Sequence, residues 1–133
     1  MTWLLDTNAC IRFLNGRSAR LRARFDVADP AQIYVCSVVK AEMYFGAALA
    51  RDPAEALAEQ QTFLSRFVSL AFDDRAAVEY ALIRADLRQR GALIGPNDMM
   101  IAAICRASGL TLVTHNVGEF GRVAGLVIDD WEA

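Results

Sequence analysis

The sequence is poor in the residues that build zinc sites and disulfide frameworks. Its 133 residues include three cysteines and one histidine, and no two cysteines form a Cys-x-x-Cys pair. Because a structural zinc ion needs several such ligands at short spacing, we do not expect a zinc site. An odd number of widely spaced cysteines also argues against disulfides, so we predict buried thiols in a reducing cytoplasm.

The chain also lacks the long apolar runs of membrane proteins. Residues Met1–Asp6 contain no basic segment and reach an acidic residue after a short apolar run, which is unlike a signal peptide. The sequence has no stretch of roughly 18 apolar residues, which a membrane-spanning helix would require. We therefore expect neither a signal peptide nor a transmembrane segment.

The apolar content of the chain suits one folded domain. Hydrophobic residues make up 55% of the sequence and charged residues 23%, with a net charge of −2, which excludes intrinsic disorder and a strongly basic nucleic-acid coat. The length fits a single domain over residues 1–133, and the surplus of apolar residues fits an oligomer. Lys40 is the only lysine among 14 basic residues. Arginine suits phosphate binding, although a GC-rich genome produces the same bias.

Short apolar runs alternate with amphipathic segments along the chain. We expect strands at residues 2–5, 32–36, 68–72 and 110–113, and a last one around Val127-Ile128. Helices are expected between them, with these residues as caps or first-turn residues: Asp6 or Thr7, Ser18, Ser37, Pro53, Asp73 or Asp74, and Asn97. This alternation predicts an α/β fold in which helices cover both faces of a mostly parallel sheet of about four to five strands.

Acidic side chains fall where several of these strands end. Asp6 follows the first predicted strand, Glu42 lies on the helix after the second, and Asp98 begins a helix. Asn116 and Glu119 follow the fourth predicted strand. Since parallel sheets form their sites beyond the carboxyl ends of the strands, these side chains are predicted to share one cleft. Crowded carboxylates repel unless a cation separates them, and oxygen ligands suit Mg²⁺ or Mn²⁺. The pattern therefore predicts metal-dependent phosphoryl chemistry.

Each of these residues also has a purely structural interpretation. Asp6 and Asp98 could be helix caps, and Glu42 could lie on a solvated helix face. His115 is interpreted as a surface or structural residue rather than a general base. Three aromatic residues near the acids are interpreted mainly as core, although one of them could stack on a nucleobase: Tyr44, Phe45 and Phe120.

Four ordered motifs carry a resemblance to a known family. They are Leu4–Asn8, Ala41–Ala47, Gly95–Ala103 and Thr114–Phe120, and the resemblance extends over essentially the whole chain. In this order and spacing they resemble PIN-domain ribonucleases, specifically the VapC toxins of bacterial VapBC toxin–antitoxin pairs. The resemblance implies a PIN-like three-layer α/β/α fold.

The resemblance also implies roles for individual residues. Asp6, Glu42 and Asp98 match the acidic residues of the family's site, with Asp6 and Asp98 as metal ligands. The fourth acid of many members aligns with Asn116, which carries no charge, so Glu119 is the alternative fourth residue. Supporting roles are implied for three neighbouring residues: Thr7, Asn8 and Thr114.

The resemblance implies a function in similar detail. Members of this family are Mg²⁺- or Mn²⁺-dependent endoribonucleases that inhibit translation, which implies cleavage of RNA here, with the tRNA anticodon loop as the leading substrate. The resemblance further implies a homodimer neutralised by a VapB-type antitoxin. The antitoxin would bind operator DNA, so the toxin would contact that DNA only indirectly. An arginine-rich stretch is either an RNA-backbone contact or a solvated helix face: Arg12, Arg17, Arg20, Arg22 and Arg24.

Two other functions remain open from the sequence alone. One is a PIN nuclease that processes RNA or cuts DNA without being a toxin, although the small size and lack of an added domain argue against RNA processing. The other is a non-catalytic binding module on the same fold, which Asn116 at an acidic position favours. Metal phosphatases that open with an Asp after the first strand fit less well, because Asp6-Thr7-Asn8 lacks their second Asp.

Overall fold

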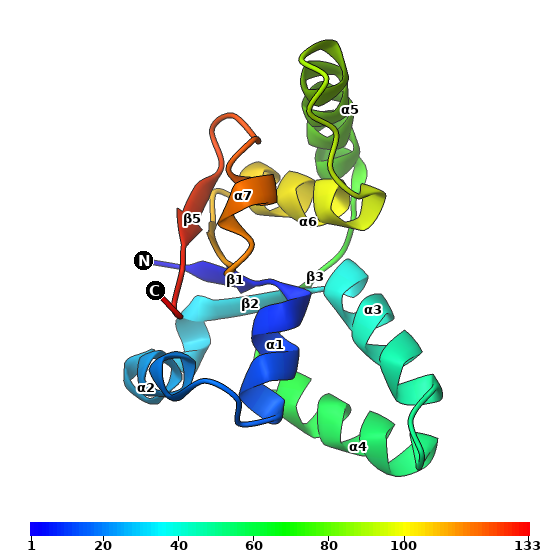
Figure 1. Cartoon of the computed structure of the whole chain (residues 1–133), viewed down its shortest axis with the longest axis vertical. Helices are drawn as coiled ribbons and strands as arrows, with labels where there is room; N and C mark the ends of the chain where they lie inside the picture. The colour runs from blue at the N-terminus through cyan, green and yellow to red at the C-terminus, as the bar shows by residue number, and fades with distance from the viewer.

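A parallel five-stranded sheet forms the centre of the computed structural model, which describes residues 1–133 (Figure 1). The strands are β1 (Trp3–Leu5), β2 (Ile33–Cys36), β3 (Val68–Leu70), β4 (Thr111–Val113) and β5 (Val127–Asp129). Their order across the sheet is β3-β2-β1-β4-β5, and every neighbouring pair is parallel. The predicted α/β fold is confirmed.

Helices cover both faces of the sheet. In Figure 1, α1 (Thr7–Leu14), α2 (Ala19–Val27), α3 (Ser37–Ala48) and α4 (Pro53–Leu64) lie below the sheet. The opposite face carries α5 (Asp74–Gln89), α6 (Pro96–Ala107) and the short α7 (Val117–Phe120), and α5 projects away from the sheet. A 3-10 turn, η1 (Pro30–Gln32), precedes β2. The arrangement is therefore three-layered, as the resemblance implies.

Some predicted helix starts are confirmed and two are wrong. Ser18 and Asp73 each accept a hydrogen bond from a backbone N–H in the first turn of α2 and α5, as N-caps do. Ser37 is already the first residue of α3, which follows β2 without a loop. Asn97 is also helical, because Pro96, whose fixed φ suits the first helical position, begins α6 one residue earlier.

The direction of strand addition reverses between β1 and β4. From β1 the chain continues to β2 and β3 on one side, whereas β4 and β5 lie on the other. Leu5 pairs with Val113, and the Asp6 N–H donates to the Val113 carbonyl over 3.0 Å. Open parallel sheets form their ligand sites at such a switch point. Asp6 and the segment after β4 are therefore placed side by side.

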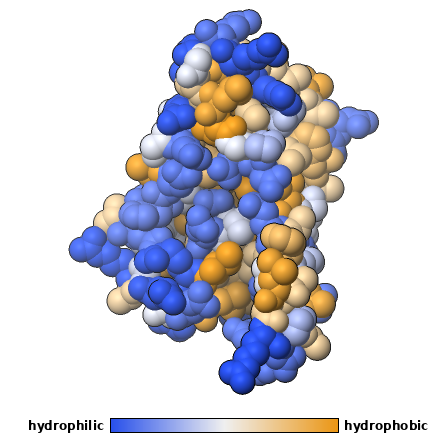
Figure 2. All heavy atoms as spheres, turned by 45° about the vertical axis from the view of Figure 1, so that its right-hand side comes forward, coloured by the Kyte–Doolittle hydropathy of each residue, from blue (hydrophilic) through white to orange (hydrophobic).

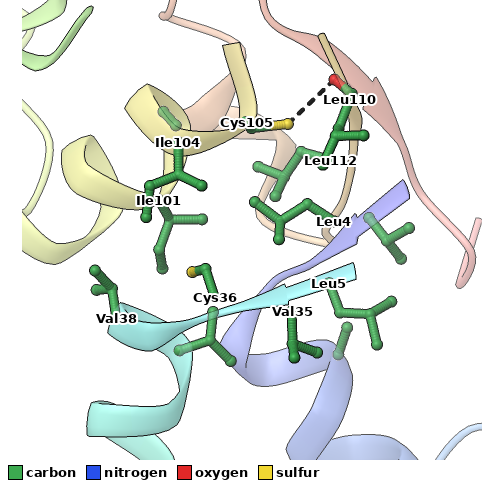
Figure 3. Packing of buried hydrophobic residues seen from close by; sticks show 14 of the residues in the cluster. Leu4, Leu5, Val35, Cys36, Val38, Ile101, Ile104, Cys105, Leu110 and Leu112 are labelled. Carbon is green, nitrogen blue, oxygen red and sulfur yellow. Dashed lines mark hydrogen bonds between the residues drawn. The ribbon is translucent and has the colours of Figure 1, made fainter. Parts of the chain in front are cut away.

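The core lies between the sheet and the helices on its two faces. Figure 3 shows Leu4 and Leu112 of the sheet on the side of Ile101 and Ile104 of α6, and all four side chains are buried. Both faces of the inner strands β1, β2 and β4 are covered, which is why Leu4-Leu5, Val35-Cys36 and Leu112-Val113 are consecutive buried apolar residues.

The three cysteines belong to this core. Cys10, Cys36 and Cys105 are fully buried and unpaired, and the Cys105 thiol donates to the Leu110 carbonyl over 3.2 Å (Figure 3). Burial raises the pKa of all three thiols, to about 11 for Cys36 and about 12 for Cys105. The prediction of buried thiols is confirmed.

Contacts with the C-terminal segment occupy part of the arginine-rich stretch. Arg12 donates to Glu132 over 2.6 Å and Arg24 to Asp129 over 2.9 Å, while Arg22 lies over an aromatic ring of α1. These contacts engage three of the five arginines, and the two interpretations of the stretch, an RNA-backbone contact or a solvated helix face, stay predictions. Two members remain exposed without such a contact: Arg17 and Arg20.

Several large apolar side chains remain uncovered. Val78 and Leu82, one turn apart on α5, are exposed, and Phe45 on α3 is 67% exposed. Phe45 was expected in the core, and that interpretation is wrong, whereas Phe120 is fully buried and Tyr44 packs against the core. Figure 2 shows apolar patches separated by hydrophilic surface on the side that it brings forward. None of the helices combines the length and apolar character that crossing a membrane requires.

Candidate active site

Asp6 lies where β1 turns directly into α1. It is 4% exposed, its Oδ1 accepts from the Thr7 N–H over 2.7 Å, and its Oδ2 accepts from the Thr114 hydroxyl over 2.8 Å. Asp6 is also the N-cap of α1, so the structural interpretation is correct for it. The hydrogen bonds from both sides hold the carboxylate in one orientation.

Thr114 connects Asp6 to the segment after β4. Its hydroxyl donates to Asp6 and accepts from the Asn116 N–H over 3.0 Å, the local turn that a threonine side chain forms two residues ahead. Asn116 Nδ2 in turn donates to Glu119 Oε2 over 3.2 Å. Asn116 therefore orients Glu119, and the two candidates for the fourth position are hydrogen-bonded to each other.

Glu42 reaches the same place from α3. Its Oε1 accepts from the Thr7 hydroxyl over 2.7 Å, while the Thr7 N–H binds Asp6. One threonine thus aligns two carboxylates. The hydrogen bond explains how an acid among apolar neighbours is tolerated, because its buried part is not left without a partner.

Asp98 enters the cluster from the first turn of α6. Burial and the negative charge of Asp6 raise the pKa of Asp98 to about 7, together with the neighbouring carboxyl groups of Glu119 and Glu42. Burial also raises the pKa of Asp6, and the charge of Glu42 adds to this while the hydrogen bonds of Asp6 act in the opposite direction. Four carboxyl groups from separate elements therefore interact at the switch point.

The cluster has the donor chemistry of a divalent-cation site. Its members offer carboxyl oxygens, and Asn116 adds an amide oxygen, which are the hard ligands that Mg²⁺ and Mn²⁺ prefer. The side chains as they stand do not form a ready group of three ligands. The raised pKa of Asp98 nevertheless records a repulsion that a cation would relieve. The residues thus fit such an ion.

Two residues singled out in the sequence stand apart from the hydrogen-bonded network. Asn8 is exposed on α1, and its supporting role stays a prediction. The His115 side chain is 62% exposed, and its Nδ1 lies 2.9 Å from an oxygen of Asp130. This agrees with the interpretation of His115 as a surface residue.

Comparisons with known proteins agree with this arrangement. The model of the PIN domain family matches residues 3–126. The chain belongs to the PIN domain family. It is similar to a tRNA(fMet)-specific endonuclease VapC from Shigella flexneri (38% identical over 131 residues, 98% of each chain) and to the one from Salmonella typhimurium (35%, 98% of each chain). The predicted resemblance to VapC ribonucleases is confirmed.

Solved structures of relatives have the same fold as this PIN domain. The DNA-bound VapBC complex from Salmonella typhimurium contains a chain with a TM-score of 0.92 at 35% identity, with 98% of each chain covered. A second match is VapBC2 from Rickettsia felis, bound to a DNA fragment from its promoter. It contains a chain with a TM-score of 0.91 at 30% identity, with 98% of this chain and 99% of that chain covered. The PIN-like three-layer architecture is thereby confirmed.

A cleft that the sequence did not indicate lies beside the acidic cluster. Ser37, Phe45, Asn97 and Met100 line a cavity of about 620 Å³ together with Glu42. Three of the lining residues, Ser37, Ala41 and Phe45, are spaced four residues apart, which places them on one face of α3. The pairing of that face with the first turn of α6 depends on the tertiary structure of the PIN domain.

Replacing Thr114 by valine tests whether this hydroxyl orients Asp6. The change keeps the side-chain shape and removes the hydrogen bonds to Asp6 and to the Asn116 N–H. We expect the affinity for Mn²⁺, measured by titration calorimetry, to fall about 10- to 100-fold, as for other residues that orient metal ligands. Thr111→Val, at the buried start of β4, is the matched control. Equal Mn²⁺ affinities of T114V and the unmodified chain would contradict the orienting role.

Proposed function

We propose that this PIN domain is the ribonuclease toxin of a VapBC-type pair and hydrolyses RNA with Mg²⁺ or Mn²⁺. The observation that carries the proposal is the four-carboxyl cluster at the β1–β4 switch point, in which Asp98 has a pKa of about 7. Relatives matched over nearly their full length are named endonucleases and ribonucleases, which supports the assignment.

Asp6 and Asp98 are the residues that would hold the ion. A divalent ion bound there supplies Lewis-acid polarisation of the phosphate and a water of lowered pKa. Asp6 is suited to this role because Thr7 and Thr114 fix its orientation. Asp98 would hold such an ion in its deprotonated form, so ion binding would release the proton that the raised pKa retains. Glu42, oriented by Thr7, orients the attacking water or completes the ligand set.

The proposed nucleophile is water, not the ribose 2′-hydroxyl. An ion at Asp6 and Asp98 would supply a bound water of lowered pKa as the nucleophile, and the single histidine, His115, lies against Asp130 outside the cluster. Hydrolysis by water leaves a 5′-phosphate and a 3′-hydroxyl. A 2′,3′-cyclic phosphate on the product would contradict this mechanism.

The proposed substrate is tRNA, cut in the anticodon loop, because single-stranded loops expose the RNA backbone and bases. The relatives from Salmonella typhimurium and Shigella flexneri are named for tRNA(fMet). Several solved relatives are VapBC complexes, two of them with DNA, which supports a VapB-type antitoxin as partner and operator DNA as an indirect one. A homodimer and a cytoplasmic location belong to the same proposal, and the exposed Val78 and Leu82 fit an oligomer.

The proposal is tested by incubating the purified, antitoxin-free protein with total tRNA in Mg²⁺ and in EDTA. Discrete fragments with 5′-phosphate ends, formed only with Mg²⁺, are expected. If tRNA is not cut, ribosomal RNA is the second substrate. A folded protein that cuts neither would overturn the nuclease and favour the non-catalytic binding module.

Separate substitutions of Asn116 and Glu119 decide which of them acts in the fourth position. We expect Glu119→Gln to lower kcat about 10- to 100-fold, because it removes a charge that interacts with Asp98. Asn116→Ala should lower kcat by a smaller factor, since Asn116 acts here by orienting Glu119. Glu59→Gln, at an exposed position of α4, is the control. A larger loss in N116A than in E119Q would instead assign the fourth position to the amide.

A further inference from the structure

The cavity beside the acidic cluster has no role in the mechanism described above. It lies between α3 and α6, which contact each other, and Figure 1 places the first turns of both helices at the same end of the sheet. Its volume of about 620 Å³ falls in the range of pockets that bind small organic groups, about 300–1,000 Å³. It is large enough for a nucleoside.

The walls of this cavity combine apolar and polar side chains. Val38, Phe45 and Met100 supply apolar surface, and Ser37 and Asn97 supply a hydroxyl and an amide. Ser37 and Asn97 are exposed, and Phe45 is 67% exposed although it is a large aromatic residue. An uncovered aromatic ring beside hydrogen-bonding groups suits a flat ligand with a polar edge.

The charge around the cavity decides which part of a nucleotide it suits. Glu42 lines the cavity and also belongs to the carboxyl cluster, so a phosphate inside the cavity would meet a negative side chain without a cation. A neutral base meets no such repulsion. Because Glu42 is common to both places, a base in the cavity would belong to a nucleotide next to the phosphate at the cluster.

We propose that this cavity binds an unpaired base of the RNA next to the cleaved phosphodiester, with Phe45 as the stacking surface and Ser37 and Asn97 contacting the polar edge of the base. The proposal rests on the proposed ribonuclease function. It makes Phe45 a residue that selects unpaired RNA, because a base held in a duplex cannot enter the cavity. Base–aromatic stacking tolerates every base, so selection among bases would come from Ser37 and Asn97.

Binding measurements test this proposal without requiring cleavage. The ligands are two labelled ten-nucleotide RNAs, one of uridines and one with the same backbone and no bases, bound by the chain with its carboxyl cluster unmodified and with Ca²⁺ in place of Mg²⁺ as the oxygen-ligated cation. The RNA is verified as intact after each titration. Fluorescence anisotropy should show that the RNA with bases binds more tightly. Adding Phe45→Ala should weaken its binding about 5- to 100-fold and leave the baseless RNA unchanged, whereas Phe45→Trp should retain the preference.

Matched controls separate the possible outcomes. Val27→Ala removes an even more exposed apolar side chain, on α2, and should change neither affinity. An equal effect of F45A on both RNAs, or no measurable RNA binding at all, would overturn the proposal. A change of molar mass in F45A, by light scattering, without a selective loss for the RNA with bases would assign this face to a second copy of the chain. If the base preference depends on Phe45 but the unmodified chain cuts no RNA, the nuclease function fails and the base pocket stands.

Discussion

Asp98→Asn is expected to lower the rate of tRNA cleavage by about 10³-fold or more. The substitution keeps the size of the side chain and removes one of the two carboxylates proposed to hold the ion. Stabilisation of the transition state by a metal ion amounts to several kcal/mol, and about 4 kcal/mol corresponds to a thousandfold change in rate. The rate is measured from fragment formation at saturating Mg²⁺, with thermal unfolding of the variant recorded in parallel.

The matched control for this substitution is Asp26→Asn. Asp26 is exposed on α2, below the sheet in Figure 1, so the control removes the same charge away from the cluster. We expect it to cleave at the rate of the unmodified chain. If D98N retained more than about a tenth of that rate, the assignment of Asp98 as a metal ligand would be wrong, because loss of a ligand costs more than 1.4 kcal/mol.

The second large effect concerns stability in the absence of metal. The pKa of Asp98 is about 7 in the folded chain and near its ordinary value of 3.8 in the unfolded chain, so between these values the folded state binds more protons. Stability contributed by Asp98 is therefore complete below pH 4 and is lost as the pH rises to 7. Because solvent screens this partly exposed side chain, we expect the free energy of unfolding to fall by only about 1–2 kcal/mol. In EDTA at pH 8, D98N should therefore be more stable than the unmodified chain.

Chemical denaturation at a series of pH values measures this effect. The difference in unfolding free energy between D98N and the unmodified chain should grow from pH 4 to 7 and then remain constant. Mg²⁺ should stabilise the unmodified chain increasingly over the same range, because cations and protons compete for Asp98. D98N should show a much smaller response to Mg²⁺. A pH-independent difference would show that the cluster does not raise the pKa of Asp98.

The local sequence was sufficient to predict the strands and most helix starts. The strands are short apolar runs, and Ser18 and Asp73 are capping residues whose effect acts within one turn. The exceptions were Ser37 and Asn97, where a strand joined directly to a helix and a proline in the first turn moved the starts. Helix boundaries of this kind depend on small differences between competing local conformations.

Exposure was less predictable than secondary structure. Phe45, Val78 and Leu82 are apolar residues on helices, and Phe45 was interpreted as a core residue. All three are exposed, because they lie on helix faces that no other element of the chain covers, and α5 projects away from the sheet in Figure 1. Arg12 and Arg24 are charged residues that are less free than a solvated helix face would leave them, because acidic residues near the C-terminus pair with both of them.

The sequence alone determined that acids follow the strands of an α/β fold and that four motifs match PIN-domain ribonucleases. The first conclusion depends on residue order, which periodicity and spacing record directly, and the second depends on a resemblance of the motifs to a known family. Only the tertiary structure decided that Thr114 binds Asp6, that Thr7 links Asp6 to Glu42, and that the pKa of Asp98 rises to about 7. These properties depend on distances and burial between residues from separate elements, which packing sets and local sequence does not encode.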